Sequence, residues 1–308
     1  MNSTVFKGFA LAIIAATFWG VSGTFGQFLF QERNINVEWL ITTRMLVSGL
    51  LLLLFASVWE KEKVTGIWKN RKDSIQLLIF SMTGMLAVQY TYFAAIKHSN
   101  AATATVLQYA GPIIIAVYLA MKHRRLPRPK ESLAIFLAVS GTFLLVTHGD
   151  FNGLAISKMA IFLGLASAVA LAVYTLQPIG LLSRYKPSVV IGWGMLYGGL
   201  VFSFVKAPWD VDGIWDVYTY SYTVLIILFG TLAAFTLYLY AVKIIGGQKA
   251  SLLASAEPLA ATLLAVHWLQ TPFSLLDWIG SLCIVSTVFL LSKNNKPSTE
   301  IDTSIKQG

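Results

Sequence analysis

The chain has 308 residues, of which 56% are hydrophobic and only 12% are charged, and its mean hydropathy is +0.68. Soluble domains carry about 25% charged residues, so this composition excludes a soluble globular protein and indicates repeated membrane crossing. The net charge of +9 would suit a nucleic-acid-binding protein, but the cations lie between long apolar stretches, where they indicate membrane orientation instead.

Ten apolar stretches follow one another along the chain. The first, residues 8–30, has no charged residue and is long enough to cross a hydrocarbon core of ~30 Å as a helix. A cleaved signal peptide is the alternative, but the stretch is too long and no small-x-small cleavage site ends it. We therefore predict an all-α polytopic membrane protein with ten transmembrane helices, near residues 8–30, 37–58, 75–96, 100–121, 132–147, 159–180, 188–205, 221–243, 249–269 and 275–292.

The basic residues are distributed unevenly over the two ends of these spans. If the N-terminus is inside, 18 of the 23 Lys and Arg residues fall on the cytoplasmic side. Four fall outside, namely Arg33, Lys97, Lys158 and Lys206, and Arg44 lies within a span. The positive-inside rule then predicts a multi-pass protein of the cell membrane with both termini in the cytoplasm.

Residues 84–112 are repeated at 230–258 with a constant offset of 146, and ten of the 29 positions are identical. Among the identities are the pairs Gly84/Gly230, Tyr92/Tyr238, Lys97/Lys243, Ala104/Ala250 and Pro112/Pro258. Each half holds five spans, an odd number, so the second half enters the membrane inverted. We predict two inverted repeats, at 1–148 and 149–293, followed by a disordered cytoplasmic tail at 294–308, with a binding site between the halves near the midplane.

Glu257 and Arg44 are the charged residues placed deep in spans. Glu257 lies about 12 Å from the start of its span, on a stripe of small residues. A carboxylate at that depth faces a partner or a wet cavity and suits proton coupling, or it is a structural group bound to a backbone or tyrosine donor. Arg44 could fix a substrate carboxylate, bind Glu257 or extend outward to the interface.

The prolines and aromatic residues of the spans complete the candidate site. Pro112 and Pro258 stand at equivalent positions and each removes a backbone hydrogen bond, so they predict interrupted helices beside a cavity, or simple packing kinks. We expect the cavity to centre on the fourth and ninth spans, around Gln108, Pro112, Ser255 and Glu257. Polar-aromatic residues suited to a small amphipathic solute, or to interface anchoring and packing, are Trp19, Gln89, Tyr90, Tyr174 and Tyr238.

The sequence offers no signature of cofactor, metal or ATP chemistry. Cys283 is the single cysteine, no two histidines share a metal-ligand spacing, and no Walker A sequence or glycine-rich phosphate loop is present. No catalytic set is found at a common depth, so we expect neither an enzyme nor a cofactor. Transport would then draw its energy from a gradient or an exchange.

The chain resembles the EamA family of the drug/metabolite transporter superfamily over residues 8–292. The likeness rests on Phe18-Trp19-Gly20, Thr43-Arg44, Gly111-Pro112, Ala256-Glu257-Pro258 and Ile279-Gly280. Residues 99–108 and 245–251 look particularly like bacterial inner-membrane members of the YicL type. The resemblance implies a ten-helix bundle whose cavity is lined by spans 1, 3, 4, 6, 8 and 9, with spans 5 and 10 at the periphery.

The same resemblance implies export of small metabolites, often amino acids, by secondary transport. We therefore expect a secondary active exporter that works by alternating access, with Glu257 as the candidate for proton coupling. A facilitator or exchanger without ion coupling is the alternative, and a membrane-embedded lipid-modifying enzyme is the alternative from another class. The expected partners are a small-molecule substrate and the lipid bilayer, without nucleic acid, and a homodimer is left open.

The charge distribution generates a test of the topology. Cysteine introduced as Lys97→Cys or Lys249→Cys into a Cys283→Ala background is treated with an impermeant thiol reagent in intact cells. Lys97→Cys should be labelled, because its loop is predicted outside, and Lys249→Cys should react only after the cells are permeabilised. The reverse pattern would contradict the predicted topology.

Overall fold

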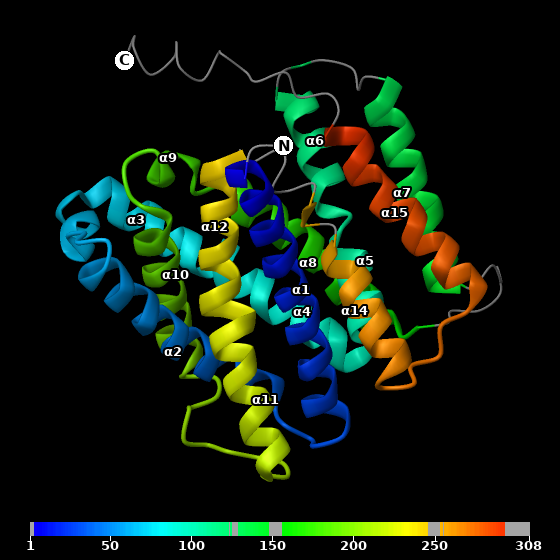
Figure 1. Cartoon of the computed structure of the whole chain (residues 1–308), viewed down its shortest axis with the longest axis horizontal. Coiled ribbons are helices and arrows are strands. Elements are labelled where there is room, and N and C mark those ends of the chain that lie inside the picture. Colours follow the sequence, from blue (N-terminus) through cyan, green and yellow to red (C-terminus); the bar gives the residue numbers. More distant parts are fainter. Residues whose placement is uncertain are drawn as a thin grey trace.

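A computed structural model describes residues 3–122, 124, 129–147, 156–245, 253–254 and 256–292, and within these residues all regular structure is helical (Figure 1). Each of the ten predicted spans contains one helix or a run of consecutive helices, which confirms the predicted fold class. In chain order the main elements are α1 (Ser3–Gln31), α2 (Val37–Val58), η1 (Val64–Lys69), α3 (Arg71–Ile79), η2 (Phe80–Leu86), α4 (Ala87–His98), α5 (Ala101–Gln108), α6 (Gly111–Lys122), α7 (Pro129–Thr147), α8 (Lys158–Leu176), α9 (Ile179–Leu182), α10 (Pro187–Phe202), α11 (Val217–Ile227), η3 (Leu228–Ala233), α12 (Ala234–Ile245), α14 (Ala256–His267) and α15 (Leu275–Ser292).

Six helical stretches among the described residues are long and apolar enough to cross a membrane, and they lie at Val5–Gln31, Val37–Val58, Arg71–His98, Ala101–Lys122, Lys158–Leu182 and Val217–Tyr238. Three shorter apolar helices occupy the fifth, seventh and tenth predicted spans. The ninth span is described only from residue 253, so its predicted beginning, like the tail, lies outside the described residues.

The third and eighth spans are not the uniform α-helices that periodicity predicts. Each contains a π-helical segment, η2 in the first half and η3 in the second. Gly84 lies within η2 and its repeat partner Gly230 lies within η3, so the two halves share this irregularity. A π segment inserts an extra residue into the hydrogen-bond pattern, which widens the helix locally and often marks a functional site.

The fourth and ninth spans are interrupted next to their prolines, as predicted. A turn at Tyr109 and Ala110 separates α5 from α6, and Pro112 is the second residue of α6. Pro258 is likewise in the first turn of α14, shortly after the turn at Ala254. Proline is tolerated in a first helical turn because the missing N–H has no intrahelical acceptor there.

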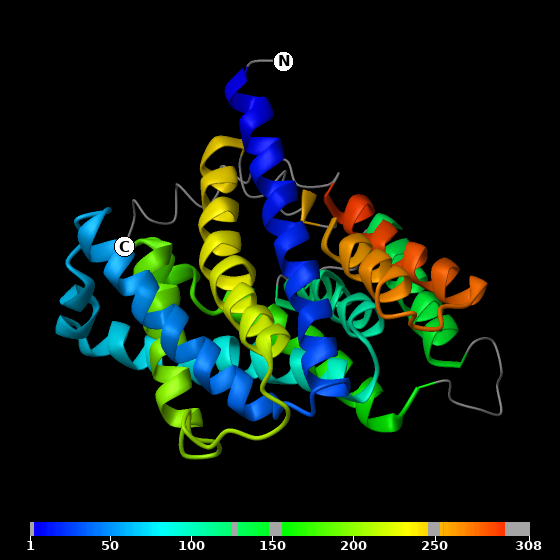
Figure 2. The same ribbon diagram turned by 60° about the horizontal axis from the view of Figure 1, so that its bottom comes forward.

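Most helices pack against a helix of the other half. The equivalent helices α2 and α10 pair with each other, as do α7 and α15 and, over a shorter length, α5 and α14. α1 packs on α12 and α14 of the second half, and its counterpart α8 packs on α4 and α5 of the first. α7 and α15 lie together at one edge, and α1, α12 and α14 run through the middle (Figures 1 and 2).

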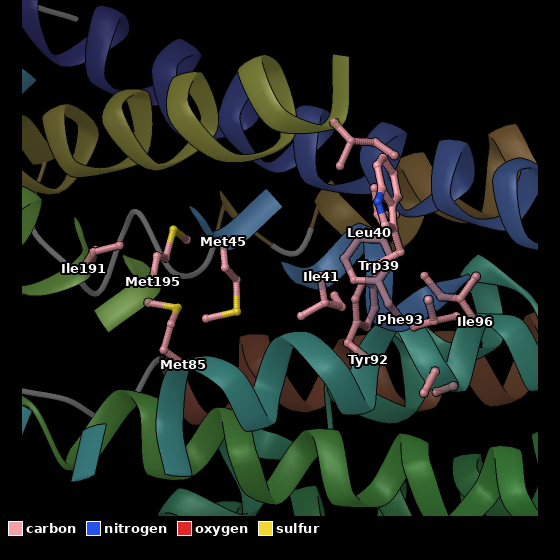
Figure 3. Packing of buried hydrophobic residues seen from close by; sticks show 14 of the residues in the cluster. Trp39, Leu40, Ile41, Met45, Met85, Tyr92, Phe93, Ile96, Ile191 and Met195 are labelled. Carbon is pink, nitrogen blue, oxygen red and sulfur yellow. The ribbon is translucent and has the colours of Figure 1, made fainter. Parts of the chain in front are cut away.

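The interior between α2, α4 and α10 is filled by large apolar side chains (Figure 3). Met45, Met85 and Met195 are fully buried there, and Phe93 is only 1% exposed. Methionine adapts to irregular spaces, which suits the junction between a π segment and two straight helices.

Gly49 sets the distance between α2 and α10. A Cβ atom on Gly49 would lie 2.6 Å from the backbone nitrogen of Leu196 and 2.9 Å from the carbonyl oxygen of Gly192. Both neighbours are backbone atoms, so neither can rotate away. Close approach through small residues is how helices associate in lipid, where burial of apolar surface gives little net gain.

We predict that Gly49→Ala lowers the stability of the folded protein by about 1–3 kcal/mol, because the added methyl group forces α2 and α10 apart. Gly66→Ala is the matched control, because a Cβ atom there meets no other atom within 4 Å. The measurement is the thermal unfolding midpoint of each variant purified in detergent. Equal midpoints for the two variants would show that the α2–α10 contact is not limited by Gly49.

Candidate functional site

Arg44 on α2 is buried, with 4% of its surface exposed, and it binds the second half of the chain. Its Nε donates to Oγ1 of Thr231 at 2.7 Å, and its Nη2 donates to the carbonyl oxygen of Gly230 at 3.3 Å. Both acceptors belong to the π segment η3. Arg44 therefore turns into the protein, which excludes the alternative in which it extends to the interface.

Two further features of the Arg44 guanidinium are its contact with an aromatic ring and a donor without a partner in the described part of the chain. Its Cζ lies 4.9 Å from the centre of the Phe93 ring, a cation–π contact from α4. Its Nη1 is buried and has no hydrogen-bond partner among the described residues. An unpaired donor on a buried cation is costly, which makes Nη1 available to an incoming acceptor.

Glu257 lies in the first turn of α14 and faces α5 and α1. The hydroxyl group of Tyr109 donates to the carbonyl oxygen of Ala254 at 2.7 Å and lies 3.4 Å from Oε2 of Glu257. A Cβ atom on Gly20 of α1 would lie 2.7 Å from the Glu257 carbonyl oxygen. The Gly20 position thus lets α1 approach the carboxylate-bearing turn, and a tyrosine hydroxyl group, one of the two kinds of donor considered for a structural Glu257, lies beside it.

Tyr92 on α4 lies in the same interior. It is 8% exposed, and its hydroxyl group shares a 2.8 Å hydrogen bond with Oγ1 of Thr105 on α5. Its ring centre lies 5.3 Å from that of Phe93, the ring that Arg44 covers. We call the set Arg44, Tyr92, Thr105, Tyr109 and Glu257 the central polar cluster.

Arg44 and Glu257 attract each other within the central polar cluster but do not form an ion pair, since no nitrogen–oxygen distance between them is 4.0 Å or less. Arg44 comes from the first half and binds the second, whereas Glu257 comes from the second half and is bound by the first. Each charge therefore joins the halves.

Three aromatic candidates lie beside the cluster. The Trp19 ring on α1 is 5.3 Å from the ring of Tyr238 and 5.2 Å from that of Phe235, both on α12. Tyr174 on α8 stacks on Phe80, with ring centres 5.7 Å apart. The Trp19 contact thus places Tyr238 of α12 beside α1, and the Phe80 contact places Tyr174 of α8 beside η2.

The polar candidates on α4 and α5 are occupied by other contacts. Gln108 is buried, and its Nε2 donates to Oγ of Ser167 on α8 at 2.6 Å. Tyr90 donates to Glu38 at 3.3 Å and packs on Phe202, which places it on the α2–α10 side of α4 rather than beside Tyr92. Gln89 is also buried on α4, with 7% of its surface exposed.

Two further candidates have limited structural description. Ser255 lies outside the described residues, and for Pro112 only the backbone in α6 is described.

Pro258 is buried in α14 and lines a small cavity of about 20 Å³ between α5, α14 and α15. That volume accommodates about one water molecule. Side chains therefore fill the space beside Pro258, where the sequence predicted a cavity between the fourth and ninth spans.

A much larger hollow of about 760 Å³ lies away from the charges, between α8 and the η2–α4 segment. Its wall includes exposed apolar residues such as Phe162 and Val169. The hydroxyl groups of Thr83 and Thr91 in this wall are bound to carbonyl oxygens of their own helix, at 2.8 and 2.7 Å. This surface is suited to lipid chains and provides no polar recognition.

Several members of the site were not selected from the sequence. Thr231 binds Arg44, and Tyr92 and Thr105 bind each other, yet isolated hydroxyl residues in a span do not stand out. The identity of Tyr92 with Tyr238 in the repeat was the available signal for Tyr92, and Thr231 could be recognised only as the neighbour of the repeated Gly230.

We predict that Thr231→Val lowers the stability of the folded protein by about 1–3 kcal/mol, because it leaves the buried Arg44 Nε without an acceptor. Thr223→Val is the matched control, since the buried Thr223 hydroxyl group has no hydrogen-bond partner in the described part of the chain. Thermal unfolding of both variants in detergent tests the prediction. A Thr231→Val midpoint equal to that of Thr223→Val would mean that the Arg44 contact contributes nothing.

The comparisons with known proteins agree with this architecture. The sequence profile of the EamA-like transporter family matches residues 6–147 and again 158–293. The chain is 42% identical over 294 residues to the "Uncharacterized inner membrane transporter YicL" of Salmonella typhimurium, covering 94% of this chain and 96% of that protein. It is 25% identical to the "Uncharacterized transporter YwfM" of Bacillus subtilis, over 95% of each chain.

The fold itself has a solved relative. A structure described only as "Crystal structure of protein" superposes with a TM-score of 0.60 over 99% of both chains, at 18% sequence identity. The predicted resemblance is thus confirmed by the family profile and by the relative at 42% identity. The chain belongs to the EamA-like transporter family and is a multi-pass membrane transporter similar to YicL.

Proposed function

We propose that this transporter is a secondary active exporter of small organic metabolites such as amino acids, working by alternating access across the cell membrane with both termini in the cytoplasm. The observation that carries the substrate class is the pair of opposite charges, the buried Arg44 and the partly buried Glu257, which lie between the halves without forming an ion pair. A zwitterionic solute could neutralise both, with its carboxylate on Arg44 Nη1 and its ammonium group on Glu257.

Glu257 also supports a role in proton coupling. It is the acidic residue of the central polar cluster, and its nearest donor, the Tyr109 hydroxyl group, is already bound more closely to Ala254. A carboxylate held this loosely can exchange a proton for a substrate ammonium group as access alternates. Movement of solute out of the cell and of protons inward would then share one site.

A facilitator or exchanger without ion coupling is the second candidate. It is favoured by the fact that a zwitterion would satisfy Arg44 and Glu257 without any proton. In that case Glu257 binds substrate but the transport rate does not follow an imposed pH gradient, and this is what separates the two mechanisms.

We expect Glu257→Gln to abolish the response to a pH gradient. Parent and variant are reconstituted in liposomes containing a trapped pH-sensitive dye, and a mixture of the twenty protein amino acids is added outside. The parent should change the internal pH when solute enters, and the variant should show a rate at least about tenfold lower, equivalent to ~1.4 kcal/mol of lost interaction.

Asp277→Asn is the matched control for Glu257→Gln. Asp277 is a buried carboxylate that binds the N–H and hydroxyl groups of Ser274 at the start of α15. It should retain the parent response. A parent-like response of Glu257→Gln would contradict proton coupling through this residue. Mass spectrometry of medium from cells overproducing the parent would identify the exported solute directly.

A further inference from the structure

Two matching groups of contacts join the halves at opposite ends of the bundle. The first, which we call the α2 clamp, comprises Arg33, Trp39, Pro208, Trp215 and Asp216. Arg33 Nε lies 3.1 Å from Asp216 Oδ2, and Trp39 Nε1 donates to the Pro208 carbonyl oxygen at 2.7 Å. The rings of Trp39 and Trp215 cross at 82° with centres 4.9 Å apart.

The second group, which we call the α10 clamp, comprises Val64, Trp68, Asp73, Arg184 and Trp193. Arg184 Nη2 lies 2.6 Å from Asp73 Oδ1, and Trp193 Nε1 donates to the Val64 carbonyl oxygen at 2.7 Å. The rings of Trp68 and Trp193 cross at 87° with centres 5.2 Å apart. The buried Asp73 also accepts a 2.8 Å bond from Tyr185.

The two clamps contain the same kinds of contacts at corresponding places in the two halves. In each, a tryptophan of the second helix of one half binds a carbonyl group in the loop that precedes the third span of the other half. In each, an arginine that follows a first span binds an aspartate at the start of a third span. The equivalent residues are separated by 143 for the aspartates, 147 for the loop tryptophans, 151 for the arginines and 154 for the helix tryptophans, close to the repeat offset of 146.

The clamps fix the beginnings of α3 and α11 to the paired helices α10 and α2. Asp216 also caps α11 by accepting from the Thr219 N–H at 2.8 Å, and this bond holds the pKa of its carboxyl group below the ordinary value. Because α2 and α10 pack together along their length, the four segments α2, α3, α10 and α11 are tied into one body.

The π segments lie directly after these anchored beginnings. η2 follows α3 and leads into α4, which carries Tyr92, and η3 follows α11 and leads into α12, which carries Tyr238. Helices bend preferentially at π segments and at glycines, and each segment contains the repeated glycine. An anchored part, a π-helical segment with a glycine and the helix that carries Tyr92 or Tyr238 therefore occur in the same order in both halves.

We infer that both clamps stay closed throughout the transport cycle, and that access to the site is changed by α4 and α12 bending at η2 and η3 against the fixed α3 and α11. This inference rests on the proposed alternating-access function. Its rival is that the clamps are gates, one at each end, which must open in turn.

Paired cysteines in a Cys283→Ala background distinguish the two. The pairs Arg33→Cys/Asp216→Cys and Asp73→Cys/Arg184→Cys are joined with a short bifunctional thiol reagent that is cleaved by reductant. The comparison pair is Gly8→Cys/Ile245→Cys, which joins α1 to the end of α12, since a Cβ atom on Gly8 would lie 2.6 Å from the Ile245 side chain.

Transport of a radiolabelled mixture of the twenty protein amino acids is measured in liposomes before cross-linking, after it and after reduction. Both clamp pairs should keep their rates when cross-linked, whereas the Gly8/Ile245 pair should lose most of its rate and recover on reduction. Reversible loss in either cross-linked clamp pair would overturn the inference. Each pair before cross-linking is its own reference for correct folding.

Hydrogen–deuterium exchange of the parent tests bending at η2 and η3 without depending on which solute is transported. Backbone amides of η2–α4 and η3–α12 should exchange several-fold faster than those of α3 and α11. If the parent moves none of the amino acids, the proposed function fails, and exchange alone decides the inference. Equal exchange on both sides of η2 and η3 would overturn it.

Discussion

Close contact between helix backbones is the constraint on which this structure depends. Inside a bilayer, apolar side chains gain little by leaving lipid for protein, so helices must associate through dispersion contacts and hydrogen bonds. The pairing of α2 with α10, which Gly49 limits at the backbone of Leu196, provides that contact between the two halves. The anchored α3 and α11, and the helices that surround the charges, are all positioned relative to this pair.

The packing of the helices also supplies the contacts that hold the two interior charges, Arg44 and Glu257. An arginine at the centre of a membrane helix costs about 2.5–3.5 kcal/mol, and burial of a carboxylate has a cost of its own. The protein offsets part of it for Arg44 with Thr231, Gly230 and the Phe93 ring, all supplied across helix boundaries. The remaining cost is retained in the Arg44 Nη1 donor, which has no partner among the described residues, and in Glu257, whose tyrosine contact is 3.4 Å long.

Much of this organisation was predictable from the sequence. Hydropathy located the ten spans, the offset of 146 identified the repeat, and the depth of Glu257 and Arg44 within their spans selected them as the charged candidates. The prolines at equivalent positions predicted the interruptions next to α6 and α14. Each of these signals is local in the chain, or depends on a constant spacing between two parts of it.

The remaining features depend on contacts that no local pattern reveals. Nothing in the sequence of residues 80–86 distinguishes a π segment from an α-helix. Tyr90 was selected as a site candidate because it is a polar aromatic residue within a span, but in the structure it packs on Phe202. Gln108 lies at the predicted place but binds Ser167. The clamps were not predicted, because the separations between their equivalent residues differ from 146 by up to eight positions. An ungapped comparison of the two halves therefore does not align these residues.

The packing of α1 against α12 and α14 has a consequence for biosynthesis. α1 ends at Gln31, whereas α12 begins at Ala234, so its main partner is made about 200 residues later. A ribosome adding about 5–20 residues per second leaves α1 in the bilayer for roughly 10–40 s before that partner emerges. During this interval the side of α1 that carries Gly20 faces lipid or the insertion machinery. The five spans of the first half therefore cannot reach their final arrangement until nearly the whole chain has been translated.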